Sequence, residues 1–516
     1  MTTCTLGIPR VQTVTPAHSR FALTAACLAA LLLTGCANLK SEALRAEDVR
    51  TTVQADQAAL AKDVVPLSGP LTLEEAIARA IKYNAERRLR AMEEAVAYGT
   101  FDAGQFDMLP KLVASAGYRY RDKELVTRSM DSVTGAPSLA NPYISTDREA
   151  TNTSLAFSWS LLDFGQSYYA ARQNADRVQI ASERRRKAIN TLVQDVRTSY
   201  WRVVAAQKLD GSLRATISEA EAALGDARKA EEEKLRSPLE PLRYQRQVLE
   251  SVRTLEAIQQ ELSTARIELA SLIGLPAGAS AQVQVVEPAT TVSKVWLDVP
   301  VDRMEARALA LNPDLRESLY NTRIAQEETR RVMLRMFPGL SFNYALNHST
   351  DSYLINDTWK EAGVQVSFNL LGLFAMPAQK RLAEAGVSLA DQKRMATQVA
   401  VLTQLHVARL QYANAAHQFE RADAIADVDQ RIAGHVANQA AAARQTRLEN
   451  VAQQTATILS ILRRYQALSN AQAAASRLQA TLGLEPVIEG SDQLPLPELS
   501  QVVSKSLAQW NAGRLE

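Results

Sequence analysis

The sequence has few cysteines and histidines, and their positions exclude several kinds of chemistry. The three cysteines, Cys4, Cys27 and Cys36, all lie near the N-terminus of the 516-residue chain, so no disulfide framework can hold the remainder together. The five histidines are scattered, and none pair at the i, i+4 spacing of a zinc site. No nucleophile, phosphate-binding or metal motif stands out either. We therefore expect a protein that is not an enzyme and that holds no metal and no other cofactor.

The chain also lacks a dominant charge. Its 58 Lys and Arg residues nearly balance its 56 Asp and Glu residues. This balance gives no overall basic field, so we expect no nucleic-acid partner. Aromatic residues make up only 6% of the sequence, whereas Ala, Gln, Leu, Arg and Glu are abundant. Such a composition is typical of long helices and coiled coils.

Long hydrophobic runs are missing as well. The apolar run 21–33 follows Arg20 and is shorter than the ~20 residues of a spanning helix, so it is typical of a secretory signal peptide. It leads into the segment 33–36 (LTGC), which resembles the lipobox of bacterial lipoproteins. That resemblance implies that Cys36 is lipidated and, because Ala37 follows it, that the anchor lies in outer-membrane lipid. With no other long apolar run, any membrane crossing by the mature chain must be made by strands.

Four segments alternate with the period of two that is typical of strands: residues 109–121, 154–161, 337–347 and 363–371. Each has an apolar face that includes Phe, Tyr or Trp, and a polar face. Their length of about 9–11 residues matches a tilted strand that crosses a bilayer. The pattern predicts a lipid-facing side and a water-filled lumen, lined by Arg119, Arg121, Ser158, Asn343 and Gln365. A soluble sheet packed on helices has the same periodicity.

Helical signals fill most of the remaining sequence. Residues 72–104 begin with the capping-box pair Thr72 and Glu75 and predict one helix. Residues 170–236 contain no proline and predict a very long helix. Residues 237–272 predict a returning helix with a coiled-coil seam made of Val248, Val252, Leu255, Leu262 and Leu269.

The chain contains an internal repeat. Asn84, with its preceding Arg-Ala-Ile, recurs as Asn312 with Arg-Ala-Leu, at an offset of 312 − 84 = 228. Gly274 recurs as Gly483, at an offset of 483 − 274 = 209. The difference of 228 − 209 = 19 residues falls in the loop between the first two strands, residues 122–149, as expected for an exposed tip.

The repeat defines the domain organisation that we predict. A signal peptide (1–35) and a lipidated arm (36–70) precede the first repeat (71–276), and a linker (277–298) joins it to the second repeat (299–486). A C-terminal tail (487–516) follows. Four strands cannot close a barrel, and open edges are not tolerated in lipid, so the chain must oligomerise if its strands span a membrane. Two copies would give eight strands and three would give twelve, and the spacing does not choose between them.

Several motifs in this order resemble the TolC-like outer-membrane efflux protein family, in its lipoprotein branch. They are the helix opening 71–84, Leu109-Pro110 before the first strand, Trp159 with the segment 162–165 (LDFG), the segment 195–201 (DVRTSYW) and the two helix tips. The resemblance implies an α+β membrane protein. It would be a homotrimer with a twelve-stranded transmembrane β-barrel, four strands per chain, continued by a long periplasmic α-helical coiled-coil barrel.

The resemblance also implies sites at the periplasmic tips. Glu449 would narrow the periplasmic mouth, although it also suits the simpler role of a first-turn acid that stabilises its helix. Arg444 and Arg447, at the same mouth, would pair with Glu449 across protomers or simply be solvated. The tips that would contact a periplasmic adaptor include Arg236, Ser237, Glu240 and Thr446. The family's tip glycines and a further acid at Ala452 are absent. We expect the basic run 184–187 to be a solvated helix face.

The function that the resemblance implies is a passive exit duct of a tripartite efflux system. It would lie in the cell outer membrane, lipid-anchored and with a large periplasmic portion. It would export small molecules such as drugs or metal ions from an inner-membrane transporter through a periplasmic adaptor. A duct for type I protein secretion is one alternative. A periplasmic coiled-coil lipoprotein scaffold without a pore is another.

Overall fold

The computed structural model describes residues 43–514 except 138–140, 233–238, 442–446 and 487–492. The chain divides into two compact units, Met1–Asp63 and Val64–Glu516. In the first unit the described part contains the helix α2 (Ala46–Ala61), all of whose side chains are exposed. The signal peptide and Cys36 lie outside the described residues.

The second unit contains a four-stranded antiparallel sheet. It is built from β1 (Lys111–Tyr120), β4 (Glu149–Ser160), β5 (Gly339–Ser349) and β6 (Thr358–Ser367), in the order β1-β4-β5-β6. A small hairpin of β2 (Val126–Thr127) and β3 (Tyr143–Ile144) lies in the loop between β1 and β4. Within the described chain β1 and β6 each have one neighbouring strand, so the sheet has two open edges.

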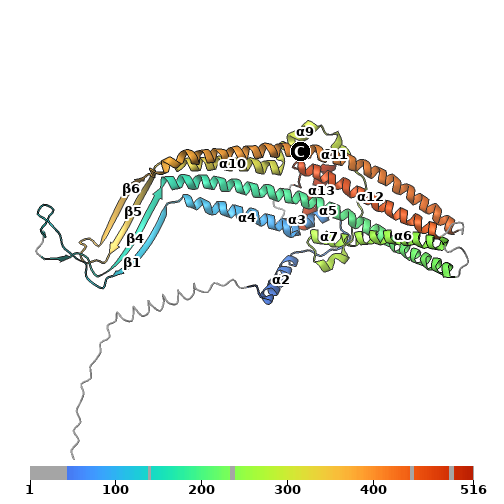
Figure 1. Ribbon diagram of the computed structural model, residues 1–516, viewed down its shortest axis with the longest axis horizontal. Coiled ribbons are helices and arrows are strands. Elements are labelled where there is room, and N and C mark those ends of the chain that lie inside the picture. Colours follow the sequence, from blue (N-terminus) through green and yellow to red (C-terminus); the bar gives the residue numbers. More distant parts are fainter. Residues whose placement is uncertain (1–42, 138–140, 233–238, 442–446, 487–492, 515–516) are drawn as a thin grey trace, which may run out of the picture. The chain divides into compact units, whose positions relative to one another are not determined.

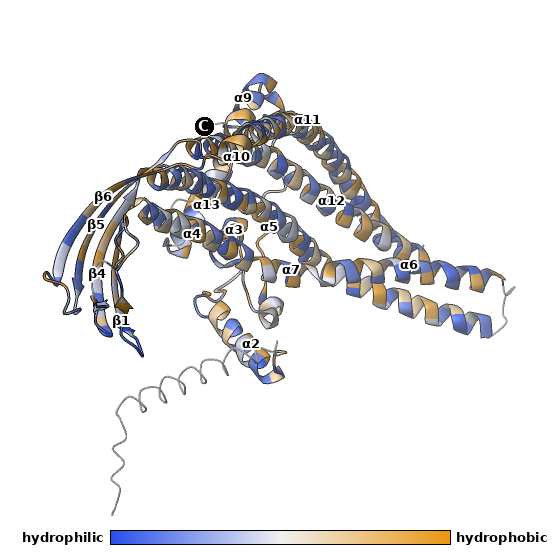
Figure 2. Cartoon of the chain, turned by 60° about the vertical axis from the view of Figure 1, so that its left-hand side comes forward, coloured by the Kyte–Doolittle hydropathy of each residue, from blue (hydrophilic) through white to orange (hydrophobic). Residues whose placement is uncertain are grey.

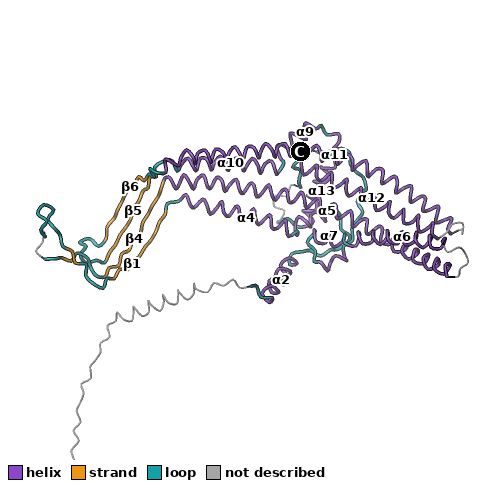
Figure 3. The backbone as a smooth tube through the Cα atoms, in the orientation of Figure 1, coloured by secondary structure: helices purple, strands orange, loops and turns teal. Residues whose placement is uncertain are grey.

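Each half of the sheet leads into a long helical hairpin (Figures 1 and 3). The strand β4 passes directly into α5 (Leu161–Glu232), from which α6 (Leu239–Ser263) and α7 (Ala265–Leu272) return. The strand β6 is followed by α11 (Gly372–Ala441), from which α12 (Arg447–Thr481) returns. Figure 2 shows hydrophilic and hydrophobic residues interspersed along these helices. Such a pattern gives each helix a buried stripe and an exposed one.

Two helices also precede each hairpin of strands. They are α3 (Leu73–Tyr83) and α4 (Ala85–Gln105), followed by the short η1 (Phe106–Met108), in the first repeat, and α9 (Val301–Leu311) and α10 (Pro313–Leu334) in the second. The bounds of α3 and α9 differ by 228 residues at both ends, and α5 and α11 end 209 residues apart. The structure therefore carries the repeat that the sequence predicts.

The prediction of one helix over residues 72–104 is wrong, because the helix is interrupted at Asn84. Its backbone is extended, with ψ of 128°, and its side-chain oxygen accepts a hydrogen bond from the backbone N–H of Arg87. Asn312 interrupts the second repeat in the same way and caps α10. An asparagine that caps the next helix satisfies backbone donors which a break would otherwise leave free.

Two strand boundaries also differ from prediction. The second strand begins at Glu149 rather than at residue 154, because residues 149–153 pair with Gly117, Ala116 and the end of β1. The fourth strand is Thr358–Ser367 rather than 363–371. The apolar residues beyond it belong to a turn in which the Asn369 side chain caps Gly372 N at 2.9 Å. The alternation of apolar and polar residues therefore extends beyond the last paired residue of the sheet, Ser367.

The long helices lie side by side in a fixed order. Near the sheet, α5 packs between α4 and α10, and α10 packs against α11. In the hairpins, α5 packs between α6 and α12, and α12 packs against α11. The predicted seam is confirmed, because Val248, Leu255, Leu262 and Leu269 are buried and Val252 is half-buried. The helices α4, α6 and α11 are therefore the lateral edges of the row.

The connector and C-terminal tail form the middle of the second unit. The connector contains η2 (Ala277–Gln282) and α8 (Val295–Asp298), and α13 (Leu496–Asn511) lies in the tail and packs against α3. Leu71 bridges Val285 of the connector in parallel. Arg79 donates to the backbone oxygen of Val65 at 2.6 Å, so the end of the predicted arm belongs to this unit.

Candidate channel face and periplasmic mouth

Strand register places most of the predicted lumen residues on one face of the sheet. Ser158 lies opposite Asn343, and Gln365 lies opposite Ser341, two positions from Asn343 on the same strand. Cross-strand partners share a face, and so do residues two apart. By the same count Arg119, which lies opposite Ala150, belongs to this polar face. Its role as a lumen lining stays a prediction.

The opposite face of the sheet is apolar and uncovered. We call it the apolar face; it includes Leu112, Tyr118, Leu155, Phe157, Trp159, Phe342, Tyr344, Leu346, Val364 and Val366. Apart from the half-buried Trp159, these side chains are exposed in the chain by itself. A contiguous apolar surface of this kind marks contact with lipid or with a partner.

The loops at the far end of the sheet are joined by polar contacts. Arg119 forms an ion pair with Asp351 at 3.5 Å, and the buried Asp351 carboxylate accepts a hydrogen bond from Asp147 N. Arg121 follows β1 and donates to Thr146 Oγ1 at 3.0 Å. These contacts hold the loop after β1 against the loop after β5.

At the opposite end, the described residues of the two helical hairpins are held together by polar contacts within one chain. Arg447 Nη1 lies 2.5 Å from Asp226 Oδ2, which joins α12 to α5. Asn450 Nδ2 donates to Glu219 Oε1 at 2.7 Å one turn further along. Beneath these contacts Ala220, Ala223, Val248 and Val451 form a small buried cluster. Separating the hairpins therefore requires breaking both polar and apolar contacts.

The other predicted tip residues divide into two groups. Glu449 and Glu240 are exposed residues in the first turns of α12 and α6, where an acid stabilises the helix N-terminus. The remaining predicted tip residues lie outside the described residues: Arg236, Ser237, Arg444 and Thr446. Asp226, the partner of Arg447, was not predicted, because no local pattern marks a contact between residues so far apart in sequence.

The prediction that residues 184–187 form a solvated face is only partly right, because Arg184 and Lys187 are exposed but Arg185 and Arg186 are half-buried, and all four pair with acidic residues. Arg184 pairs with Glu317 at 2.7 Å and Lys187 with Asp314 at 2.7 Å, both toward α10. Arg185 pairs with Glu94 of α4 at 2.9 Å. Four consecutive residues cover a full helical turn, so their side chains reach both neighbouring helices.

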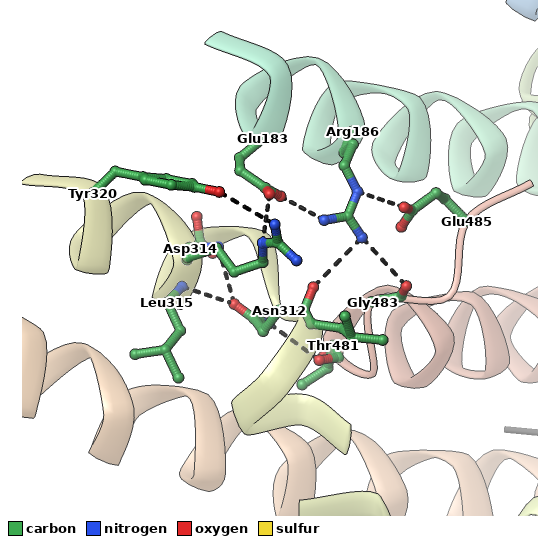
Figure 4. Close-up of polar contacts among 11 residues, drawn as sticks. Glu183, Arg186, Asn312, Asp314, Leu315, Tyr320, Thr481, Gly483 and Glu485 are labelled. Atoms are coloured by element: carbon green, nitrogen blue, oxygen red, sulfur yellow. Dashed lines mark hydrogen bonds and ion pairs between the residues drawn. The ribbon is translucent and has the colours of Figure 1, made fainter. Parts of the chain in front are cut away.

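Arg186 has a separate role at the break in the second repeat (Figure 4). Its guanidinium contacts Glu183 at 2.5 Å and also Glu485, and it approaches the carbonyl oxygens of Leu311 and Gly483 at 3.5 Å. Burial by itself lowers the pKa of Arg186, but the bonds to Glu485 and Glu183 more than offset this and hold the pKa above its usual value. Arg186 therefore remains a cation, and it joins α5 to the end of α9 and to the segment that follows α12.

Within the part of the chain that the structure describes, no group of three or more His, Cys, Asp or Glu is arranged to hold a metal ion. In the same residues, every helix is too short or too polar to cross a membrane.

Comparison with known proteins supports the fold described above. Residues 76–275 match the family model "Outer membrane efflux protein". A search of curated protein sequences found no match.

Among solved structures, the Campylobacter jejuni CmeC outer membrane channel is 12% identical, with a TM-score of 0.63, over 84% of this chain and 89% of that one. The Vibrio cholerae outer membrane protein VceC is 14% identical, with a TM-score of 0.59, over 80% and 96% of the two chains. The Neisseria gonorrhoeae MtrE outer membrane channel, solved in its open state, is 13% identical, with a TM-score of 0.59, over 80% and 88%. The predicted fold class is confirmed by these likenesses.

Proposed function

Because this chain belongs to the outer membrane efflux protein family, through its first repeat and its fold, we propose that it is the passive exit duct of a tripartite efflux system. Three copies form the duct, and each is anchored in outer-membrane lipid through Cys36. The duct exports small molecules, such as drugs or metal ions, that an inner-membrane transporter delivers through a periplasmic adaptor. Like the other channels of its family it is not an enzyme, so the transporter supplies the energy.

The observation that carries this proposal is a sheet with one apolar face and two open edges. An apolar face suits lipid, but an open edge leaves backbone groups without partners there. Pairing β6 of one copy with β1 of the next removes both edges. Three copies of four strands give a twelve-stranded barrel, with the polar face of Arg119, Ser158, Asn343 and Gln365 turned inward.

The internal repeat indicates how the helices of neighbouring copies would pack in the same assembly. Inside one chain, α5 packs on α10, and Gln173 Nε2 lies 3.3 Å from the backbone oxygen of Ile324. The equivalent residues, at the offsets of 209 and 228, are Leu382 on α11 and Val96 on α4. These two apolar side chains are 75% and 69% exposed in the single chain. We infer that α11 of one copy packs against α4 of the next, so that Leu382 covers Val96.

The gate in this proposal is the periplasmic end of the hairpins. Opening moves α11 and α12 away from α5, which breaks the ion pair of Arg447 with Asp226 and uncovers the cluster around Val451. Three copies of Glu449 form an acidic ring at this mouth and attract cations. The exposed first turn of α6, with Glu240, contacts the adaptor.

The experiment that tests the duct is conductance in planar bilayers with the purified protein. We expect the mass of three chains in detergent, and larger currents for Arg447→Met than for the unchanged protein. Arg431→Met is the matched control, since Arg431 pairs with Asp427 on its own helix and joins no hairpins. A monomer that forms no pores, with or without Arg447→Met, would refute the proposal.

Surface labelling separates the duct from a periplasmic scaffold. Val133, in the loop after β1, is 92% exposed. In the duct this loop lies outside the cell, so Val133→Cys should react with a membrane-impermeant thiol reagent on intact cells. Protection of that cysteine until the outer membrane is permeabilised would favour the scaffold.

A further inference from the structure

A cavity of about 320 Å³ lies in the middle of the second unit, away from the sheet and the helix tips. Its walls come from α3, α5, α8, α11, α12, α13 and the connector. They include Arg197, Trp201, Trp296, Tyr412, Gln472 and Gln479. A volume near the lower end of the ~300–1,000 Å³ range of small-molecule sites, with walls that combine aromatic side chains and several polar groups, suits a small organic ligand that has both an apolar and a polar part.

Arg197 gives this cavity a cation without a counter-ion. It is 4% exposed, and its partners are neutral: Ser476 Oγ at 2.7 Å, Gln479 Oε1 at 3.3 Å, and Gln472. Among the residues that the structure describes, no carboxylate lies within ion-pair distance of its guanidinium. Burial lowers the pKa of Arg197 to about 10, so it stays protonated at neutral pH. A buried charge is costly unless an opposite charge compensates it.

Two residues that line the cavity each have a buried donor atom without a partner. Neither Arg197 Nε nor Trp201 Nε1 has an acceptor within hydrogen-bond distance, although both atoms are buried. Two other arginines with little exposed surface, the buried Arg79 and the half-buried Arg186, are bonded to carboxylates. Arg79 bonds Glu75 at 2.8 Å and two backbone oxygens, and Arg186 bonds two glutamates. Arg197 therefore lacks, among the described residues, the carboxylate partner that Arg79 and Arg186 each have.

We propose that this cavity binds a small monocarboxylate with a short apolar body. The carboxylate accepts hydrogen bonds from Arg197 and Trp201, and the apolar body lies against Trp296 and the other apolar walls. Glu74 also lines the cavity and repels a second negative charge, which favours a monoanion over phosphate. Because helices of both repeats form the walls, an occupied cavity holds the two repeats together. This inference does not depend on the proposed duct.

The test uses the full-length protein in detergent with benzoate as the probe. Benzyl alcohol has a similar body without charge, and inorganic phosphate is an oxyanion without an apolar body. We expect benzoate to raise the thermal unfolding midpoint in a saturable way and to change tryptophan fluorescence. Benzyl alcohol and phosphate should do neither at the same concentrations.

Variants connect this response to the cavity. Arg197→Met should abolish the benzoate response, and Trp201→Phe should weaken binding by about tenfold or more, because a bond to a charged group is lost. Glu74→Gln should strengthen binding. Arg202→Met is the matched control, since Arg202 pairs with Glu268 and does not line the cavity, and it should bind benzoate normally.

Some outcomes would overturn the inference. No response of the unchanged protein to benzoate would do so, as would an equal response in Arg197→Met, or equal responses to benzoate and phosphate. If Arg197→Met does not fold, Trp201→Phe and Glu74→Gln decide the question by the direction of their effects. If the unchanged protein showed no channel conductance, that result would contradict the proposed duct but would not bear on the cavity.

Discussion

Replacing Gly483 by alanine should destabilise the packing around the break between α9 and α10 in the second repeat. Gly483 follows α12 with φ of +66°, a left-handed conformation that residues with a Cβ rarely adopt. A Cβ at this position would lie 2.4 Å from the backbone oxygen of Leu311 and 2.7 Å from its carbonyl carbon. The neighbour is backbone, and it is held in place because Asn312 Nδ2 donates to Thr481 O at 3.1 Å.

The size of the effect follows from two costs. The left-handed conformation costs a non-glycine residue roughly 1–2 kcal/mol. Forcing the backbone of Leu311 away resembles overpacking of a core, which costs about 1–3 kcal/mol. We therefore expect Gly483→Ala to destabilise the protein by roughly 2–5 kcal/mol. The shift also disturbs the contact of Arg186 with the oxygen of Gly483.

The assay is thermal unfolding in detergent, followed by the apparent midpoint and by the fraction of oligomer that remains. Gly386→Ala, inside α11, is the control because a Cβ there would meet nothing within 4 Å. Alanine in a helix interior should stabilise by about 0.5–1 kcal/mol. Gly274→Ala, the repeat equivalent with φ of +74°, should destabilise like Gly483→Ala. A Gly483→Ala protein that unfolds at the unchanged midpoint would refute the reasoning.

Three further predictions concern the gate, pH and the contact between copies. The variant Arg447→Met/Asp226→Asn should conduct as much as either single variant, because each removes the same ion pair; additive increases in planar bilayers would contradict this. Asp195 is an exposed residue, but partial desolvation and repulsion by Glu86 raise its pKa above 3.8, so the protonated form favours the fold and stability falls slightly as pH rises through the raised pKa. Asp195→Asn should thus have a higher thermal unfolding midpoint than the unchanged protein at pH 7, and the two midpoints should agree below pH 3.8. A difference in midpoint that stays the same from pH 7 to below pH 3.8 would count against this. Val96→Cys/Leu382→Cys should give chains cross-linked between copies on oxidation, while either single variant should not; a cross-linked pair within one chain would contradict the inferred packing.

Much of the fold follows from local pattern. Alternation identifies four strands, because a strand with two different environments must alternate with period two. The duplicated asparagines and glycines identify two repeats, and the heptad seam on α6 and α7 identifies the buried side of the returning helix. Each strand, seam and capping motif depends on residues close together in sequence, and the repeat is the recurrence of such local motifs at offsets of 228 and 209, so the sequence alone reveals them. The broken helix at Asn84 is the exception, since asparagine suits a helix cap and does not exclude a helix interior.

The contacts between distant elements were decided only by the tertiary structure. The basic run 184–187 has the composition of a solvated face, and only the packing of α5 between α4 and α10 supplies its acidic partners. Asp226 was not identified, since its contact with Arg447 joins residues of different repeats. Arg197 was part of a motif, but its lack of a counter-ion depends on which residues six helices and the connector bring around it. The sequence by itself determined the periodic elements and their repetition, because each element's pattern is local. Only the tertiary structure determined which charges are paired, and that Arg197 has no carboxylate partner among the described residues, because ion pairing depends on distance in space.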